Sequence, residues 1–123
     1  MPLSRSFKET VKERARGDPT FRDALLAEGI DALLSGDLDV GKAIIRDFIN
    51  ATIGFEHLAE ETGTPSKSLM RMFGPAGNPS ARNLFTVIGV LQRSSGTSLR
   101  VVSGLKTPRS RTPGSKPALR RAS

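Results

Sequence analysis

Two cations, Lys67 and Arg71, lie four residues apart in the second half of the chain. On an α-helix this spacing places both side chains on one face. An ammonium or guanidinium group there can contact guanine O6 and N7 in the major groove of DNA, or a phosphate. Nearby, Ser66 and Ser68 can hydrogen-bond to bases or phosphates, and Met70 can contact a thymine methyl group. The alternative is an ordinary solvated helix face.

Two short helices around a glycine turn are expected to position these residues. The first is predicted to turn Leu58 inward and to end at Gly63, because glycine readily adopts a left-handed backbone. The second is predicted over residues 66–73, with Thr64 as its capping residue and Pro65 as its first residue. This order is typical of a helix-turn-helix, in which the start of the second helix enters the major groove.

Three further helices are predicted upstream: a short one through Phe7, Val11 and Ala15 that ends at Gly17, and two over residues 18–36 and 37–54 with Asp18 and Asp37 as caps. Short joints between helices favour an all-α fold, here a domain of five to six helices. The residues predicted to face its core, by their helical spacing, are Phe7, Val11, Ala15, Phe21, Leu25, Ile30, Leu33, Leu34, Val40, Ile44, Ile45, Phe48, Ile49, Leu84, Val87, Ile88 and Leu91.

The last helix is expected to begin at Pro79 or Ser80 and to end near Gly96. Arg82 lies in its first turn, where outward-pointing N–H groups can help it to bind a phosphate. Residues 98–102 then favour a short β-strand. A strand this short needs a partner, so we expect it to pair with itself across a dimer or with another chain.

Charge divides the chain into two halves. Residues 1–61 contain 8 Lys/Arg and 12 Asp/Glu, whereas residues 62–123 contain 11 Lys/Arg and no acid. Unopposed positive charge attracts polyanions, so nucleic acid is the expected partner and an anionic membrane surface the rival. Residues 103–123, with three prolines and six basic residues, predict a disordered basic tail that either adds DNA affinity or only solubilises the chain. We therefore divide the chain into N-terminal helices (1–53), a DNA-binding unit (54–102) and this tail.

Several kinds of chemistry are excluded by missing residue types. The chain has no Cys and one His, which excludes disulfides, thiolate metal sites and two-histidine metal sites. Glu60 and Glu61 are adjacent, so on a helix they point about 100° apart and form no acid–base pair. We expect neither an enzyme nor a bound cofactor or metal. No apolar run reaches the roughly 20 residues of a membrane span and no secretory signal begins the chain, so a cytoplasmic location is expected.

The segment from Leu58 to Val102 resembles the Xre/Cro-type helix-turn-helix of addiction-module antidote proteins, the antitoxins of bacterial type II toxin–antitoxin pairs. The likeness covers about residues 54–102 and extends weakly upstream. Pro65 stands where the family usually has a capping Ser, and the basic tail is an addition. The matching pieces are Leu58-Ala59-x-x-Thr62-Gly63, Leu69, Gly77-Asn78-Pro79, Leu84 and Leu99-Arg100-Val101-Val102.

This resemblance implies a homodimer that binds double-stranded DNA at its own promoter and neutralises a small ribonuclease-like toxin of the RelE/ParE type. The acidic N-terminal half suits such a basic partner. The residues that the resemblance places at the DNA are Ser66, Lys67, Ser68, Met70 and Arg71 on the reading face, Asn78 in the next loop, and His57 where the family often has a phosphate-contacting Gln.

Other interpretations remain open from the residues themselves. Asn78 can simply form a turn, and His57 can be an exposed helix residue. At the level of the whole protein, one alternative is a stand-alone helix-turn-helix regulator without a toxin. Another is a protein-interaction module whose DNA-binding unit has degenerated.

Overall fold

The computed structural model describes residues 5–104, and these form six α-helices with no strand among them. In chain order they are α1 (Arg5–Gly17), α2 (Pro19–Leu34), α3 (Leu38–Ala51), α4 (Phe55–Thr62), α5 (Ser66–Met72) and α6 (Ala81–Ser95). The all-α prediction is confirmed. The predicted basic tail, apart from its first two residues, lies outside the described part of the chain, as do the side chains of Phe7 and Val11.

Local signals in the sequence explain where the first helices begin. The Asp18 side chain accepts a hydrogen bond from the Phe21 amide at 3.1 Å, and Pro19 occupies the first helical position of α2. The Asp37 side chain caps α3 in the same way through the Val40 amide. Both predicted caps are confirmed, although α3 ends at Ala51, earlier than the predicted Gly54.

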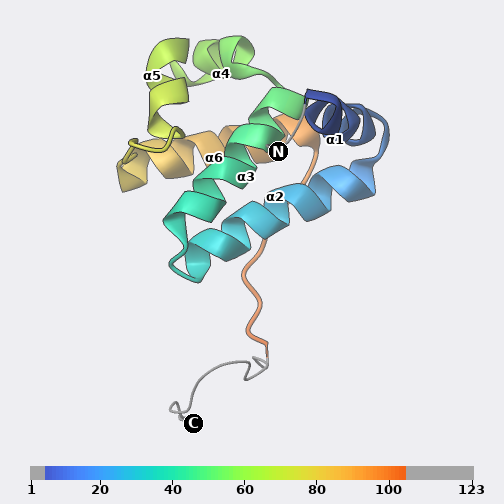
Figure 1. Ribbon diagram of the computed structural model, residues 1–123. Helices are drawn as coiled ribbons and strands as arrows, with labels where there is room; N and C mark the ends of the chain where they lie inside the picture. Colours follow the sequence, from blue (N-terminus) through green and yellow to red (C-terminus); the bar gives the residue numbers. More distant parts are fainter. Residues whose placement is uncertain (1–4, 105–123) are drawn as a thin grey trace, which may run out of the picture.

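The helices pack around one hydrophobic core (Figure 1). Helices α2 and α3 form a close pair joined by residues 35–37, α6 passes behind α3, and α4 and α5 sit together at one end of the molecule. The core draws on α2 through α6; its fully buried side chains include Leu26, Ile45, Phe48, Ile49, Leu58, Phe73 and Leu91. Burying each such side chain stabilises the fold by roughly 1.5–3 kcal/mol.

The predicted core stripes are partly wrong around the joint between α2 and α3. Leu34 and Val40 were expected inside, yet they are 66% and 46% exposed, because the joint lies at the edge of the core. Leu26 was missing from the predicted stripe and is completely buried. Helical spacing locates an apolar face, but it does not say how far along the helix that face is covered.

The end of the described chain also differs from the prediction. Helix α6 ends at Ser95 with Gly96 as its C-cap, near the expected position, and the Thr97 hydroxyl then donates a hydrogen bond to an Asp23 carboxylate oxygen on α2. The predicted strand at residues 98–102 is absent, and no other strand lies in the part of the chain that the structure describes. Among residues 5–104, no helix is long and apolar enough to cross a membrane.

Candidate nucleic-acid interface

A tight turn joins α4 to α5. The Gly63 backbone is left-handed, with φ of 75°, and its N–H donates to the Ala59 carbonyl at 2.8 Å, so α4 ends where the sequence predicts. The Thr62 hydroxyl donates to the Leu58 carbonyl at 2.9 Å and accepts from the Thr64 amide at 3.2 Å. These bonds fix the direction in which the chain leaves α4.

The predicted cap of α5 is wrong by one residue. Pro65, with φ of −57° and ψ of 143°, is the N-cap, and no side chain caps the helix. Thr64 lies one residue before the N-cap, and its side chain accepts no hydrogen bond from the first turn of α5. Proline is suited to this place because its fixed φ matches the extended backbone that precedes a helix and it has no N–H to leave unpaired.

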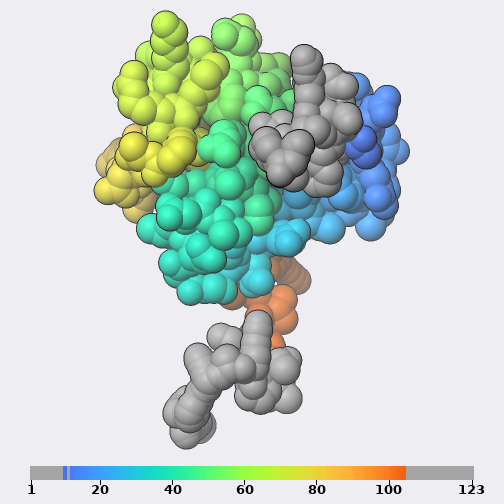
Figure 2. Space-filling model, viewed as in Figure 1, coloured from blue at the N-terminus to red at the C-terminus, as the bar shows by residue number. Residues whose placement is uncertain are grey.

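Helix α5 has one buried face and one exposed face. Leu69 and Phe73 are 1% and 0% exposed and anchor the helix in the core. Lys67, Met70 and Arg71 are exposed, and their spacing of three and four residues places them on one face of the helix. In Figure 2 the green and yellow-green atoms of α4 and α5 project at one end of the molecule. The structure therefore presents both predicted cations and the methionine together to solvent.

Two cations on α3 hold the far end of α5. The ammonium group of Lys42 donates to the carbonyl oxygens of Gly74 at 3.1 Å and Gly77 at 2.6 Å, and it is only 7% exposed. One turn later, the Arg46 guanidinium donates to the Phe73 carbonyl at 2.9 Å. Positive charge is favourable here, because the last carbonyl groups of a helix point outward without partners. We call Lys42 and Arg46 the α3 clamp.

The α3 clamp was not predicted from the sequence, although one signal for it is present there. Lys42 lies three residues before Ile45, inside the apolar stripe of α3. A lysine on a buried helix face needs acceptors for its protons, since an unpaired buried charge is costly. The sequence does not say that those acceptors lie more than 30 residues away.

The loop after α5 folds back tightly against it. A Cβ atom on Gly77 would overlap the carbonyl groups of Arg71 and Met72, so only glycine fits at this position. The next residue, Asn78, is exposed. Ser80 then caps α6 by accepting a hydrogen bond from the Asn83 amide at 3.1 Å, so the helix begins at Ala81, one residue after the later of its two predicted starts. Arg82 lies exposed in the first turn of α6.

Two of the predicted contact residues already have carboxylate partners in the free chain. The Ser66 hydroxyl donates to a Glu56 oxygen at 3.4 Å, and His57 Nε2 lies 3.4 Å from a Glu61 oxygen. Ser68 is half-buried and less accessible than Lys67. Of the polar residues predicted to contact DNA, those that are exposed and have no carboxylate partner within the described chain are Lys67, Arg71, Asn78 and Arg82.

Charge is arranged unevenly around the α4–α5 pair. Helix α4 carries three exposed carboxylates, Glu56, Glu60 and Glu61. The charged residues of α5 are both cations, Lys67 and Arg71. A polyanion approaching α5 therefore meets attraction there and repulsion from α4.

In residues 5–104 no group of three or more His, Asp or Glu side chains could hold a metal ion. Comparison with protein-family models, curated proteins and solved structures gave no match for the chain.

Proposed function

We propose that the chain is a sequence-specific DNA-binding protein that reads the major groove through α5, with α4 and α5 acting as a helix-turn-helix. The observation that carries this proposal is the two-faced character of α5. Its buried residues Leu69 and Phe73 fix the helix in the core while Lys67, Met70 and Arg71 stand exposed on one face. A short helix with one face buried in the core and an exposed face that carries cations has the form expected of a recognition helix.

The α3 clamp supports the same proposal. Reading bases requires a helix that is held rigidly, because a small displacement breaks bidentate hydrogen bonds. A free helix of seven residues is unstable in water, so α5 depends on its surroundings. Lys42 and Arg46 supply three hydrogen bonds to carbonyl oxygens at its C-terminal end and in the loop that follows.

Charge suggests how the protein docks on DNA. Carboxylates on α4 repel phosphates, so the favourable approach brings the exposed face of α5 into the groove and keeps α4 away from the nearest strand. Arg82 at the start of α6 and Asn78 in the preceding loop are exposed and available for phosphates on one side of α5. His57 joins them only if it exchanges Glu61 for a phosphate.

We further propose that the protein works as a homodimer that represses its own promoter and serves as the antitoxin of a type II pair. Two α5 helices would occupy half-sites about 34 Å apart on a palindrome, where the dimer would obstruct RNA polymerase. The antitoxin role is supported by the resemblance of residues 54–102 and by the acidic N-terminal half, which suits a basic ribonuclease-like toxin.

Fluorescence anisotropy with DNA from upstream of the gene tests the DNA-binding proposal. At about 0.15 M salt, binding should be at least about 10³-fold tighter than to a scrambled duplex. Equal affinity for both duplexes would refute sequence-specific reading. The antitoxin role has its own test: the product of an adjoining small basic reading frame should bind the chain and lose its ribonuclease activity. A chain that represses its promoter without such a partner would be a stand-alone regulator.

A further inference from the structure

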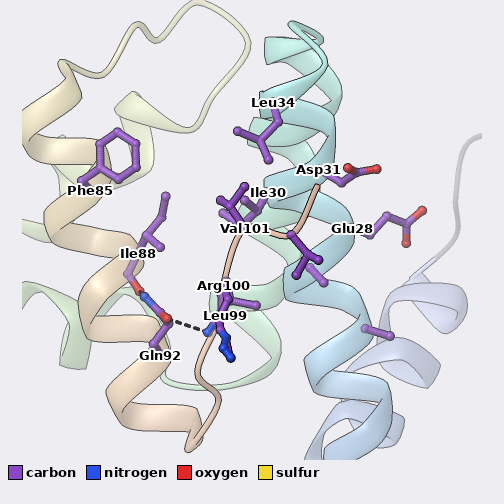
Figure 3. Close-up of a pocket in the computed structure, with 13 residues that line it drawn as sticks. Glu28, Ile30, Asp31, Leu34, Phe85, Ile88, Gln92, Leu99, Arg100 and Val101 are labelled. Carbon is purple, nitrogen blue, oxygen red and sulfur yellow. Dashed lines mark hydrogen bonds between the residues drawn. The ribbon is translucent and has the colours of Figure 1, made fainter. Parts of the chain in front are cut away.

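A hydrophobic groove of about 720 Å³ lies between α2 and α6 (Figure 3). The segment after α6 runs along it, and apolar side chains of all three elements point into it. Leu34 and Phe85 are each 66% exposed, and Val101 and Val102 are 84% and 80% exposed. Single exposed apolar residues are common, but a cluster from three elements marks a surface that binds something.

Charged side chains of both signs line the same groove. Glu28 and Asp31 stand on α2, and Arg100 stands on the segment that follows α6 (Figure 3). Within residues 5–104 none of the three forms an ion pair. The groove therefore has an acidic edge and a basic edge, each without a partner. A surface with both signs is complementary to a copy of itself turned by a two-fold axis.

The backbone of the segment is also unpaired. Leu99 is held in place, because its N–H donates to the Gln92 side chain at 2.8 Å. Beyond it, no hydrogen bond of the described chain uses the backbone of Arg100, Val101 or Val102. Two adjacent β-branched residues favour a strand, and an exposed row of N–H and C=O groups is a template for pairing with another chain.

We infer that this groove is the interface with a second copy of the chain, and that residues 100–102 pair with their equivalents across a two-fold axis. A segment that meets itself across such an axis runs antiparallel. Val101, Val102 and Phe85 would become buried, and Arg100 of each copy would reach the acidic edge of the other. The inference rests on the proposed function only in supplying the dimer that reads two half-sites, and it is tested without DNA.

Sedimentation of the full chain over a dilution series provides the first test. We expect a dimer that dissociates on dilution. Val101→Lys and Phe85→Ser should each raise the dimer Kd by at least about tenfold, the effect expected at the centre of an interface. Both side chains are exposed in the single chain, so helix content by circular dichroism should stay unchanged. The matched control is Leu38→Ser, which removes a 55% exposed apolar side chain outside the groove and should leave the Kd unchanged.

A charge exchange makes the test specific for self-association. Arg100→Glu alone, and Glu28→Arg with Asp31→Arg, should each yield monomers, because like charges then meet across the axis. An equimolar mixture of the two variants should form heterodimers, since each basic edge again meets an acidic one. A wild-type chain that stays monomeric, a dimer indifferent to Val101→Lys, or a mixture that stays monomeric would each overturn the inference. A monomeric chain whose groove instead binds another protein overturns it equally.

The two proposals fail separately. A dimer that sediments as expected but binds both duplexes equally removes the proposed DNA reading and leaves the interface standing. A monomer that binds a half-site by sequence does the reverse.

Discussion

The ammonium group of Lys42, on α3, lies 2.6 Å from the carbonyl oxygen of Gly77, 35 residues further along the chain. A second hydrogen bond to Gly74 makes this lysine the link between α3 and the loop after α5. Asp39 lies 3.9 Å away but is 91% exposed, so the carbonyl groups are the principal partners of the buried charge.

Lys42→Met should lower the free energy of unfolding by about 1–3 kcal/mol, because two carbonyl groups lose their donor while the apolar stem is retained. Urea denaturation followed by circular dichroism measures this change. The control is Lys12→Met on α1, which removes an exposed lysine and should change stability by less than about 0.5 kcal/mol. Equal effects at the two positions would mean that the hydrogen bonds of Lys42 do not stabilise the fold.

Gly77→Ala should destabilise the protein by at least about 1 kcal/mol, because the new methyl group collides with backbone carbonyls at the end of α5. Gly17→Ala is the control: no atom lies within 4 Å of a Cβ at that position, so the change should be neutral or stabilise α1 by up to about 1 kcal/mol. The thermal midpoints of the two variants should therefore move in different ways. A Gly77→Ala variant as stable as the wild type would show that the loop can move aside.

Arg71→Ala should weaken binding to the promoter duplex by about 1–3 kcal/mol if Arg71 reads a guanine, with a smaller effect on scrambled DNA. Fluorescence anisotropy on both duplexes gives the two values. Arg93→Ala, which removes an exposed arginine from the last turn of α6, is the control and should leave the specificity ratio unchanged. An equal loss on both duplexes would assign Arg71 to a phosphate.

Deletion of residues 105–123 should make DNA binding less sensitive to salt. The deletion removes six basic residues and keeps the described part of the chain intact. Each phosphate contact that is lost should reduce the slope of log K against log salt by up to about 0.9. Anisotropy titrations over a range of salt concentrations measure the slope. If it stays the same, the tail makes no contact with DNA.

Ser80→Ala should cost about 1 kcal/mol of stability, since it removes the side-chain cap of α6. Thr64→Ala should cost less than about 0.5 kcal/mol, because Thr64 does not cap α5. Paired denaturation curves compare the two variants. A larger loss at Thr64 would restore the capping role that the sequence suggested.

Helix boundaries were predictable here because their causes are local. An Asp or Ser side chain caps the helix that follows within three residues, as at Asp18 and Ser80, and Gly63 and Gly96 end helices through their own left-handed backbone. The cap of α5 was misassigned by one residue, because Pro65 takes the N-cap position itself and no side chain caps the helix. The error at this cap is a shift of one residue, since the contacts that set a helix boundary are close in sequence.

The environment of the candidate site was less predictable. The exposed cations Lys67 and Arg71 followed from helical spacing alone. The acceptors of Lys42 did not, because which carbonyl groups meet a buried lysine depends on how α3 and α5 cross in space. The groove between α2 and α6 likewise joins helices about 60 residues apart in sequence, and no periodicity within either helix indicates the other.

The link between Lys42 and Gly77 bears on how freely the α4–α5 pair can be exchanged between proteins. Transplanted onto another scaffold, the pair would leave behind the side chains that hold the end of α5, together with Ile45 and Phe48, which belong to the same hydrophobic core as Leu69 and Phe73. A graft would carry the exposed residues of α5 but not their orientation. Redesign of the proposed DNA specificity should therefore change side chains on α5 in place and retain α3 as it is.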